Sequence, residues 1–309
     1  MRILVAGGSG AIGRQLVPRL VAAGHEVWGM TRSESRREMV ESMGAGAVVV
    51  DALDAERVSV AVAEAQPDAI IHELTSIGSL DIRNLDLCFA ATNRLRTDGT
   101  DHLLAAGRAV GVQRFIAQSY AGWPYARIGG ALKTEEDPLD QRPPRKMRET
   151  LNAIRHLEAA VTGAEWTEGI VLRYGALYGP GTSLQPGGEQ WEQVRKRRFP
   201  VVGDGGGVWS FVHVEDAAAA TVAALDRGRR GIYSVVDDDP AAVAEWLPAL
   251  ARKIGAPEPW RVPRFIGRLA AGEVGVVMMT EVRGASNAKA KRELGWQPGR
   301  PSWREGFGS

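Results

Sequence analysis

The chain has 309 residues, 44% of them hydrophobic, so it can bury a large core as one two-lobed unit or as two closely joined domains. Its 38 basic and 37 acidic residues leave a formal charge of +1, which excludes a global field for nucleic acid or an anionic membrane. Cys88 is the only cysteine, and the histidines show no metal-ligand spacing, so we expect neither a disulfide within the chain nor a metal site.

The chain starts directly on strand residues, without a charged and then apolar leader. Its longest suspicious apolar piece, Val274 to Thr280, is far shorter than the roughly 20 residues that span a bilayer. We therefore expect a soluble cytoplasmic protein with a small-molecule substrate and with no membrane or nucleic-acid partner.

Three glycines stand between the first apolar strand and an amphipathic helix, Arg14 to Ala23. Glycine allows a sharp bend and a close approach of the backbone to a pyrophosphate, while the N-terminus of the helix favours negative charge. The turn therefore predicts a dinucleotide site, rather than an ordinary loop, with these contact residues: Gly7, Gly10, Ala11, Ile12 and Gly13.

Short β-branched runs alternate with helical stretches along the first part of the chain. The runs are Arg2–Ala6, Glu26–Met30, Ala47–Val50, Ala69–His72, Arg114–Gln118 and Gly169–Arg173. This alternation predicts an α/β fold, a doubly wound parallel sheet of Rossmann-like type with helices on both faces.

The pattern changes after the sixth run into Gly- and Pro-rich loops, returns, and then becomes mostly helical from Ala241 onward. We predict a dinucleotide-binding domain over residues 1–180, with a returning segment at about 208–236. Residues 181–207 and 237–309 are predicted to form a smaller substrate-binding lobe over the carboxyl ends of the strands, where ligands bind in such sheets.

Arg32 follows the second predicted strand, where an acidic residue would bind the adenosine ribose of NAD and an arginine would accommodate the extra phosphate of NADP. We therefore favour NADP over NAD. The alternative is that Ser35 and Glu38 form a capping box and that the arginines, Arg36 and Arg37 included, only cover a solvated helix. Asp51 and Ala52, after the third strand, are expected near the adenine, although an exposed loop Asp is an alternative.

Several further pieces are specific when taken together. They are Asp51 to Asp54, Thr97-Asp98-Gly99-Thr100, Gly111-Val112, Phe115 to Ser119, Leu172-Arg173-Tyr174, Tyr178-Gly179-Pro180-Gly181, Phe211 to Asp216 and Glu293-Leu294-Gly295-Trp296. With the glycine turn, they make the chain resemble an extended short-chain dehydrogenase/reductase of the NAD-dependent epimerase/dehydratase family. The resemblance implies a bound nicotinamide dinucleotide, with Tyr174 among its contacts, and a homodimer through paired helices.

The chain departs from this family at the Tyr and Lys pair, four residues apart on one helix, that carries its chemistry. None of the five tyrosines has a lysine four positions later in the chain. When Glu158 is aligned with the Glu that follows the pair in the family, Thr150 stands at the Tyr position and Ile154 at the Lys position. Ser119 and Tyr120, after the fifth strand, are the remaining candidates, with Tyr120 where the family's catalytic Ser or Thr stands. We predict Ser119, Tyr120 and Thr150 as catalytic residues, against the alternative that Tyr120 only packs at a strand end.

The missing lysine bears on the direction of the reaction. A tyrosine near its usual pKa of about 10 is only ~0.1% ionised at neutral pH, so it is a poor base and a serviceable neutral proton donor. Such a site suits reduction better than oxidation of an alcohol.

Two further departures bear on the substrate. In family members that act on nucleotide sugars, an Asn and an Arg bind the diphosphate. Ala176 and Trp209 stand at these positions here, and an indole cannot replace a guanidinium. Trp123, Trp191, Trp209 and Met278-Met279 would line an apolar pocket if they converge, although each alone is more often core.

These features predict an NAD(P)-dependent oxidoreductase that reduces a carbonyl or activated alkene of a small, fairly apolar metabolite. Two alternatives stay open. One is an isomerase, epimerase or dehydratase that recycles its bound cofactor, and the other is a non-catalytic NADP-sensing protein.

Overall fold

The centre of the computed structural model, which describes residues 1–78, 81 and 83–307, is a seven-stranded sheet with the order β12-β7-β5-β4-β1-β2-β3. Residues 79, 80, 82, 308 and 309 of the two predicted domains lie outside the described residues. Neighbouring strands of the sheet all pair in parallel, which confirms the predicted doubly wound Rossmann-like sheet. The strands are β1 (Arg2–Ala6), β2 (Glu26–Thr31), β3 (Gly46–Val49), β4 (Ala69–His72), β5 (Arg114–Tyr120), β7 (Glu168–Tyr174) and β12 (Gly231–Val235).

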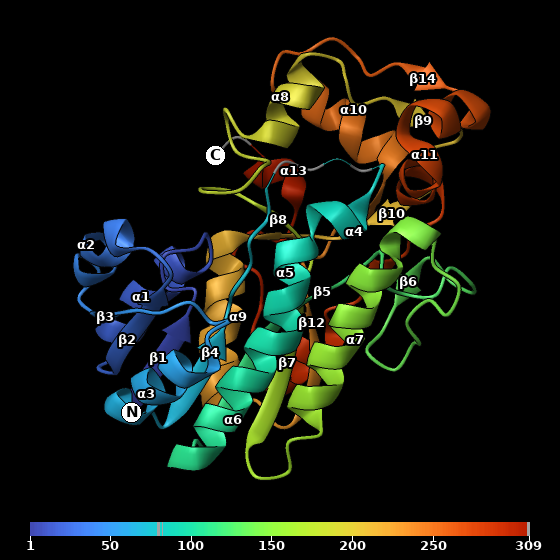
Figure 1. Cartoon of the computed structure of the whole chain (residues 1–309). Coiled ribbons are helices and arrows are strands. Elements are labelled where there is room, and N and C mark those ends of the chain that lie inside the picture. The colour runs from blue at the N-terminus through green and yellow to red at the C-terminus, as the bar shows by residue number, and fades with distance from the viewer. Residues whose placement is uncertain (79–80, 82, 308–309) are drawn as a thin grey trace.

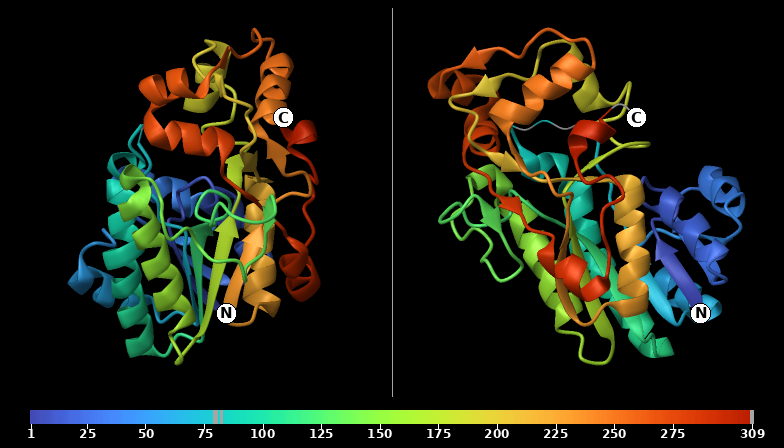
Figure 2. Two further views of the ribbon diagram at one scale, coloured as in Figure 1. Left: turned by 90° about the vertical axis from the view of Figure 1, so that its right-hand side faces the viewer. Right: turned by 180° about the vertical axis from the view of Figure 1, so that it is seen from behind.

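Helices cover both faces of this sheet, as Figure 2 shows from two sides. The helical elements in this part of the chain are α1 (Gly13–Ala22), α2 (Arg37–Glu41), α3 (Ala55–Ala65), α4 (Leu85–Cys88), α5 (Ala90–Arg94), the π-helical turn η2 (Leu95–Gly99), α6 (Thr100–Val110), α7 (Arg148–Thr162) and α9 (Val214–Arg227), with the 3-10 turns η1 (Glu34–Arg36) and η3 (Arg145–Met147). Of these, α4 and η3 lie beyond the carboxyl ends of the strands, where Leu85 and Met147 join the core of the second lobe. Successive side chains of a strand point to opposite faces, so Ile3 and Val5 share a core with α1 and α9, and Leu4 and Ala6 share one with α3, α6 and α7. The near-continuous hydrophobicity of the strands follows from this double coverage.

A second lobe lies over the carboxyl ends of the strands (Figure 1). It contains α8 (Glu189–Arg195), α10 (Val243–Lys253), α11 (Arg264–Thr280) and α13 (Trp303–Gly306). Short strand pairs tie the later segments together: β6 (Leu132–Lys133) with β15 (Gly284–Ala285), β8 (Ala176–Tyr178) with β11 (Phe211–His213), β9 (Val201–Val202) with β14 (Arg261–Val262), and β10 (Val208–Trp209) with β13 (Ala241–Ala242). Its core is aromatic, with the ring of Trp246 5.1 Å from that of Trp209 and 5.5 Å from that of Phe211.

The last helices of the chain divide between the two cores. Although the predicted lobe includes residues 237–309, α12 (Ala288–Leu294) contacts α9 and β12, and Trp296 Nε1 donates a hydrogen bond to Asp216 O at 3.1 Å. Ala290 and Leu294 are buried in the core that β1 shares with α1 and α9. The exact division into two domains stays a prediction.

Candidate active site

The glycine turn joins β1 to α1, and its backbone leaves no room for side chains. Gly7 has φ +96°, and a Cβ placed on it would lie 2.8 Å from Glu73 O. A Cβ on Gly13 would lie 2.3 Å from Gly7 O. The amides of Gly7 and Gly8 donate to Met30 O at 3.1 and 3.2 Å, which holds the turn against β2. Only glycine fits at these positions, as the sequence pattern predicts.

The turn leaves the N-terminus of α1 free for an anion. No side chain caps the helix, whose N-cap is the buried Ile12, and Ala11 before it is partly buried. Uncapped amides and the helix dipole favour a phosphate at this point. The cradle of close glycine contacts and the uncapped helix therefore fit the pyrophosphate of a nicotinamide dinucleotide.

Arg32 lies just beyond β2 on the same edge of the sheet. Its side chain is exposed, and it has no hydrogen bond or ion pair with any residue that the structure describes. Arg37, by contrast, is paired with Glu34, and Arg36 Nη1 lies 3.5 Å from Ser9 Oγ in the glycine turn. Of these three arginines, Arg32 is thus the one without a partner among the described residues. Arg36 is predicted to be a solvated surface residue, but its side chain lies next to the glycine turn.

The capping box considered for this segment is wrong. Ser35 Oγ lies 2.6 Å from Ser33 Oγ, and α2 begins at Arg37 with no side-chain cap. The reason is that Glu34 to Arg36 form a 3-10 turn, which moves Ser35 away from the helix start.

Asp51 and Ala52 follow β3. Asp51 Oδ1 accepts a hydrogen bond from Leu53 N at 3.0 Å, so the carboxylate shapes its own turn. Ala52 is buried, and its carbonyl accepts from His102 Nδ1 at 2.9 Å. Their place near the adenine stays a prediction.

Tyr174, at the end of β7, is fully buried, and its hydroxyl lies 3.0 Å from Glu73 Oε1 and 2.6 Å from Thr221 Oγ1. Thr221 donates its own proton to Ala217 O at 2.8 Å, so the single Tyr174 proton faces two acceptors unless the carboxyl carries a proton. Burial raises the pKa of Glu73 to about 8, so the carboxyl is protonated at neutral pH. The contacts favour a structural role for Tyr174; its predicted contact with the cofactor stays a prediction.

Tyr120 ends β5 at the same edge of the sheet. Its ring lies 6.2 Å from that of Trp123, and its hydroxyl forms no hydrogen bond with a described residue. Burial raises the pKa of Tyr120 to about 12, so the hydroxyl is neutral and able to donate over the whole physiological pH range. In the parallel sheet only β4 separates β5 from β1, so Tyr120 and the glycine turn follow the carboxyl ends of strands at the same edge of the sheet.

Ser119 and Thr150, the other two predicted catalytic residues, have fully engaged hydroxyls. Ser119 Oγ donates to Glu158 Oε1 at 2.7 Å, inside a buried ion pair with Arg173. Thr150 Oγ1 donates to Asp86 Oδ1 at 2.8 Å and so accepts from Asn93 Nδ2 at 3.1 Å. Because each hydroxyl has one proton, neither is free to donate to a substrate. Their catalytic roles stay predictions, and these contacts favour structural ones.

The lysine place of the family pair is apolar here. Ile154 is 1% exposed and belongs to the aromatic core of the second lobe, against which Tyr120 and Phe89 also pack. No cation replaces the lysine on α7 at this point. The site therefore has one neutral hydroxyl over an apolar wall.

Two polar residues that the sequence analysis does not identify lie near this wall, on one face of α5 and η2. Asn93 Oδ1 and Arg96 Nη1 are buried without a hydrogen-bond partner among the described residues. They stand three residues apart, which places both on the same side of the helix. No sequence signal distinguishes them, since Asn and Arg on an amphipathic helix are usually exposed.

The aromatic and methionine side chains predicted to line a pocket do converge, but as packed core. Trp209, Trp123, Met278 and Met279 belong to one buried cluster, with Trp191 at its border. Trp209 Nε1 donates to Met278 O at 2.9 Å, so the indole is held in the interior.

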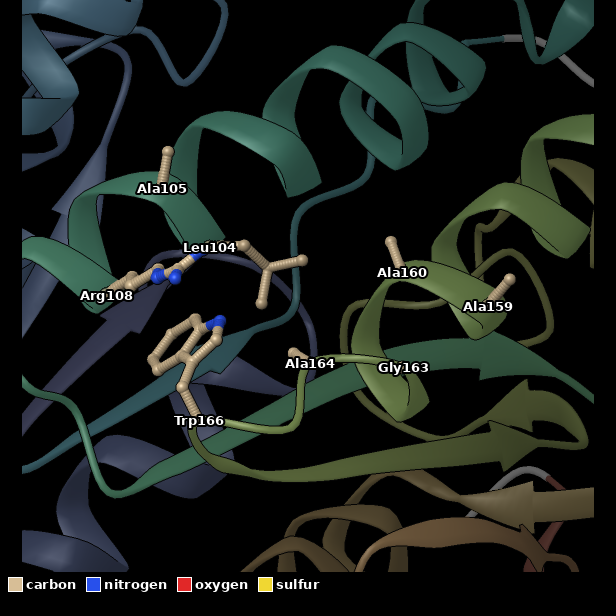
Figure 3. Close-up of a pocket in the computed structure, with 8 residues that line it drawn as sticks. All are labelled: Leu104, Ala105, Arg108, Ala159, Ala160, Gly163, Ala164 and Trp166. Atoms are coloured by element: carbon tan, nitrogen blue, oxygen red, sulfur yellow. The ribbon is translucent and has the colours of Figure 1, made fainter.

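A hollow that the structure shows on the outer face of the molecule lies elsewhere, between α6 and α7 (Figure 3). Its lining residues are Leu104, Ala105, Arg108, Ala159, Ala160, Gly163, Ala164 and Trp166. It contains none of the predicted site residues. Within the described part of the chain no helix is long and apolar enough to cross a membrane.

Comparisons with known proteins agree with this geometry. Residues 3–235 match the model of the NAD dependent epimerase/dehydratase family. The chain is 41% identical over 309 residues to a 3-diazoavenalumate denitrifying reductase of a Streptomyces species, covering 100% of this chain and 99% of that protein. It is 27% identical over 335 residues to a 4-hydroxy-2-methyl-3-oxo-4-farnesyl-3,4-dihydroquinoline-1-oxide ketoreductase of Stigmatella aurantiaca, covering 99% and 95%.

The similarity extends to solved structures. The UDP-glucose 4-epimerase of Thermus thermophilus, in complex with NAD, superposes with a TM-score of 0.74 at 26% identity, over 99% of this chain and 96% of that one. The UDP-glucose 4-epimerase of Thermotoga maritima shares the fold, with a TM-score of 0.78 at 22% identity over 99% and 96%.

Proposed function

Because the chain belongs to the NAD dependent epimerase/dehydratase family and is an NAD(P)-dependent oxidoreductase, we propose that it is an NADP-dependent reductase whose reaction needs no general acid or base pair. The cofactor supplies a hydride. The protein binds and orients the two reactants and excludes water.

The observation that carries this proposal is the chemistry at the two pair positions. Thr150 is fully buried and donates to Asp86, and Ile154 is apolar. A reaction that releases or takes up a proton at the reacting oxygen would use a free hydroxyl and a cation there. The replacement of the Tyr and Lys pair therefore supports a reduction in which no oxygen atom of the substrate gains or loses a proton.

Reductive loss of dinitrogen from a diazo compound has this property, and the reductase that is 41% identical is named for it. In the protonated diazo form, R–N2⁺, one hydride replaces the leaving group: a C–H bond forms, the C–N bond breaks, and N2 leaves with the bonding electron pair. The step consumes one NADPH and no further proton. We propose this reaction for the chain, on a substrate of aromatic character, since Phe89 and Tyr120 border the site.

Reduction of a carbonyl is the second candidate, because Tyr120 has a neutral hydroxyl without a partner among the described residues. Two relatives at 27% identity are named as a ketoreductase and a 2-alkyl-3-oxoalkanoate reductase. In this reaction Tyr120 would donate the proton to the substrate oxygen.

The test uses an aromatic diazonium carboxylate, prepared by diazotising 3-aminocinnamate, with purified protein and NADPH. We expect one N2 per NADPH oxidised, with ¹⁵N-labelled substrate followed by mass spectrometry. Tyr120→Phe should keep its kcat within about twofold, since no proton is donated.

No N2 release above the background without enzyme contradicts the proposal. If aryl ketones are reduced instead and Tyr120→Phe lowers kcat about 100-fold with NADPH affinity unchanged, the carbonyl candidate replaces it. Turnover of substrate without net NADPH oxidation would support the isomerase alternative, and cofactor binding without any turnover would support the sensor.

We also propose that the hollow between α6 and α7 belongs to a homodimer interface. Small side chains there, Ala105, Ala159 and Ala160, allow a second pair of helices to approach closely. Light scattering is expected to give twice the mass of the chain. A charged side chain introduced by Ala160→Arg should shift the protein to monomer, and a monomeric wild type would contradict the proposal.

A further inference from the structure

Arg96 is a buried cation that nothing in the described protein neutralises. Arg96 is 5% exposed, its Nη1 has no partner, and its guanidinium forms no hydrogen bond or ion pair with a described residue. Burying an unpaired charge is costly, so such a group is normally matched by an opposite charge. The expected partner of Arg96 is therefore an anion from outside the chain.

Glu158 is the carboxylate whose charge acts on Arg96, and both of its oxygens are already engaged by other residues. Glu158 Oε1 accepts from Ser119 Oγ and Arg173 Nε, both at 2.7 Å, and Glu158 Oε2 accepts from Arg173 Nη2 at 2.6 Å. This bidentate pair neutralises Arg173. Two buried guanidinium groups thus share one carboxylate, which leaves one positive charge in excess.

The other groups that interact with Arg96 carry no negative charge at neutral pH. Burial and the charge of Arg96 lower the pKa of His72 to about 4, so its imidazole is neutral. Tyr120, with its pKa raised to about 12 by burial, is neutral too. Burial lowers the pKa of Arg96 only to about 10, so its guanidinium stays charged.

The position of Arg96 is that of a ligand-binding group. The charge of Arg96 acts on His72, which ends β4, and on Tyr120, which ends β5, so the side chain lies near the edge of the sheet at which ligands bind in this fold. Arg96 belongs to η2, a π-helical turn between α5 and α6, and such turns are frequent at functional sites. Figure 1 shows α5 where the sheet meets the second lobe.

The surroundings also indicate what carries the anion. The guanidinium carbon of Arg96 lies 5.7 Å from the centre of the Phe89 ring, and Phe89 and Tyr120 pack against the aromatic core of the second lobe. A planar apolar group therefore fits beside the cation. A carboxylate matches the fork of a guanidinium with two parallel hydrogen bonds.

We propose that Arg96 binds the carboxylate of an aromatic acid substrate and thereby holds the reacting carbon near the end of β5. That the bound acid is a substrate rests on the proposed reductase function. The binding of the carboxylate itself does not depend on turnover.

The experiment measures the binding of trans-cinnamate and of its uncharged amide to the full-length protein saturated with NADP⁺. Isothermal titration calorimetry gives the Kd, and thermal unfolding gives the stability. The variants are Arg96→Gln, which removes the charge, Arg96→Lys, which keeps it, and Arg94→Gln as the matched control. Arg94 lies two positions earlier in the same helical segment, is exposed and, among the residues that the structure describes, forms an ion pair with Asp98 alone.

We expect cinnamate to bind at least tenfold more tightly than the amide. Arg96→Gln should weaken cinnamate at least tenfold and remove its preference over the amide, Arg96→Lys should lie between, and Arg94→Gln should change nothing. Because Arg96 is unpaired without a ligand, Arg96→Gln should keep or raise the melting temperature of the unliganded protein, whereas a merely structural arginine would lower it.

Three results would overturn the inference. One is no binding of millimolar cinnamate, or equal binding of acid and amide. Another is a lower melting temperature of Arg96→Gln with unchanged cinnamate affinity. The third is a loss of NADP⁺ affinity as large as that of cinnamate, which would make Arg96 a cofactor ligand. A protein that binds cinnamate through Arg96 but releases no N2 keeps this inference and rejects the proposed function.

Discussion

The glycine turn and the ends of β4 and β5 belong to one edge of one sheet, but they are constrained in different ways. At the turn, backbone atoms stand 2.3 to 2.8 Å from where Gly13 and Gly7 would carry a Cβ, so the residue type is dictated by space alone. Near the strand ends, the residues of the family pair are replaced by Thr150 and Ile154, and Arg96 lies buried beside Tyr120. The cofactor turn therefore depends on a backbone shape that only glycine allows. The reacting end, by contrast, has side chains that differ from those of the family.

The strongest test of this comparison is at the reacting end. Glu158→Gln leaves Arg173 buried without its carboxylate, so we expect a loss of about 3 to 5 kcal/mol in the free energy of unfolding, measured with urea. Glu192→Gln, in an exposed pair with Arg195, is the control and should cost less than about 1 kcal/mol. A loss below about 1 kcal/mol for Glu158→Gln would show that the buried pair of Glu158 and Arg173 does not stabilise the fold.

At the turn, Gly13→Ala pushes a methyl group against Gly7 O and so displaces the helix N-terminus from the pyrophosphate. We expect NADPH affinity, followed by the fluorescence of the bound cofactor, to fall about 100-fold, which corresponds to about 2.7 kcal/mol. Gly130→Ala is the control, because a Cβ there would meet Leu132 O only at 3.8 Å. Unchanged NADPH affinity in Gly13→Ala would separate this turn from the cofactor.

Arg32 sharpens the choice of cofactor. Removing its unengaged charge by Arg32→Ala should weaken NADP⁺ about tenfold, or about 1.4 kcal/mol, and leave NAD⁺ unchanged, as measured by thermal shift titration. Arg37→Ala serves as the control, because Arg37 is paired with Glu34. Equal or stronger stabilisation of the wild type by NAD⁺ would contradict the NADP assignment.

The smallest expected effect comes from Glu73, between the two regions. Its folded pKa of about 8 lies above the usual value, so the folded protein holds a proton that the unfolded chain loses, and this group's contribution to stability falls as pH rises from about 4.5 to 8. Glu73→Gln keeps the neutral shape, so its free energy of unfolding relative to the wild type should rise over that window by at least about 1 kcal/mol. A difference independent of pH would mean that Glu73 is ionised in the folded protein.

The parts that the sequence predicts well are those set by short-range patterns. The glycine spacing, the β-branched runs and the helical stretches between them predict the turn and a doubly wound parallel sheet, because each signal depends on residues close together in the chain. The missing Tyr and Lys pair is visible for the same reason.

The contacts that decide the chemistry join residues far apart. Thr150 looks like a candidate donor in its own helix, but its hydroxyl already donates a hydrogen bond to Asp86, 64 positions earlier. Arg96 looks like a surface arginine until β4, β5 and α7 enclose it beside His72, Tyr120 and Glu158. The sequence by itself determined the family, the sheet and the cofactor cradle, since local spacing and backbone space impose them. The tertiary structure decided which hydroxyls already donate hydrogen bonds and which buried charge has no ion-pair partner, because burial and long-range hydrogen bonds exist only once the chain has folded.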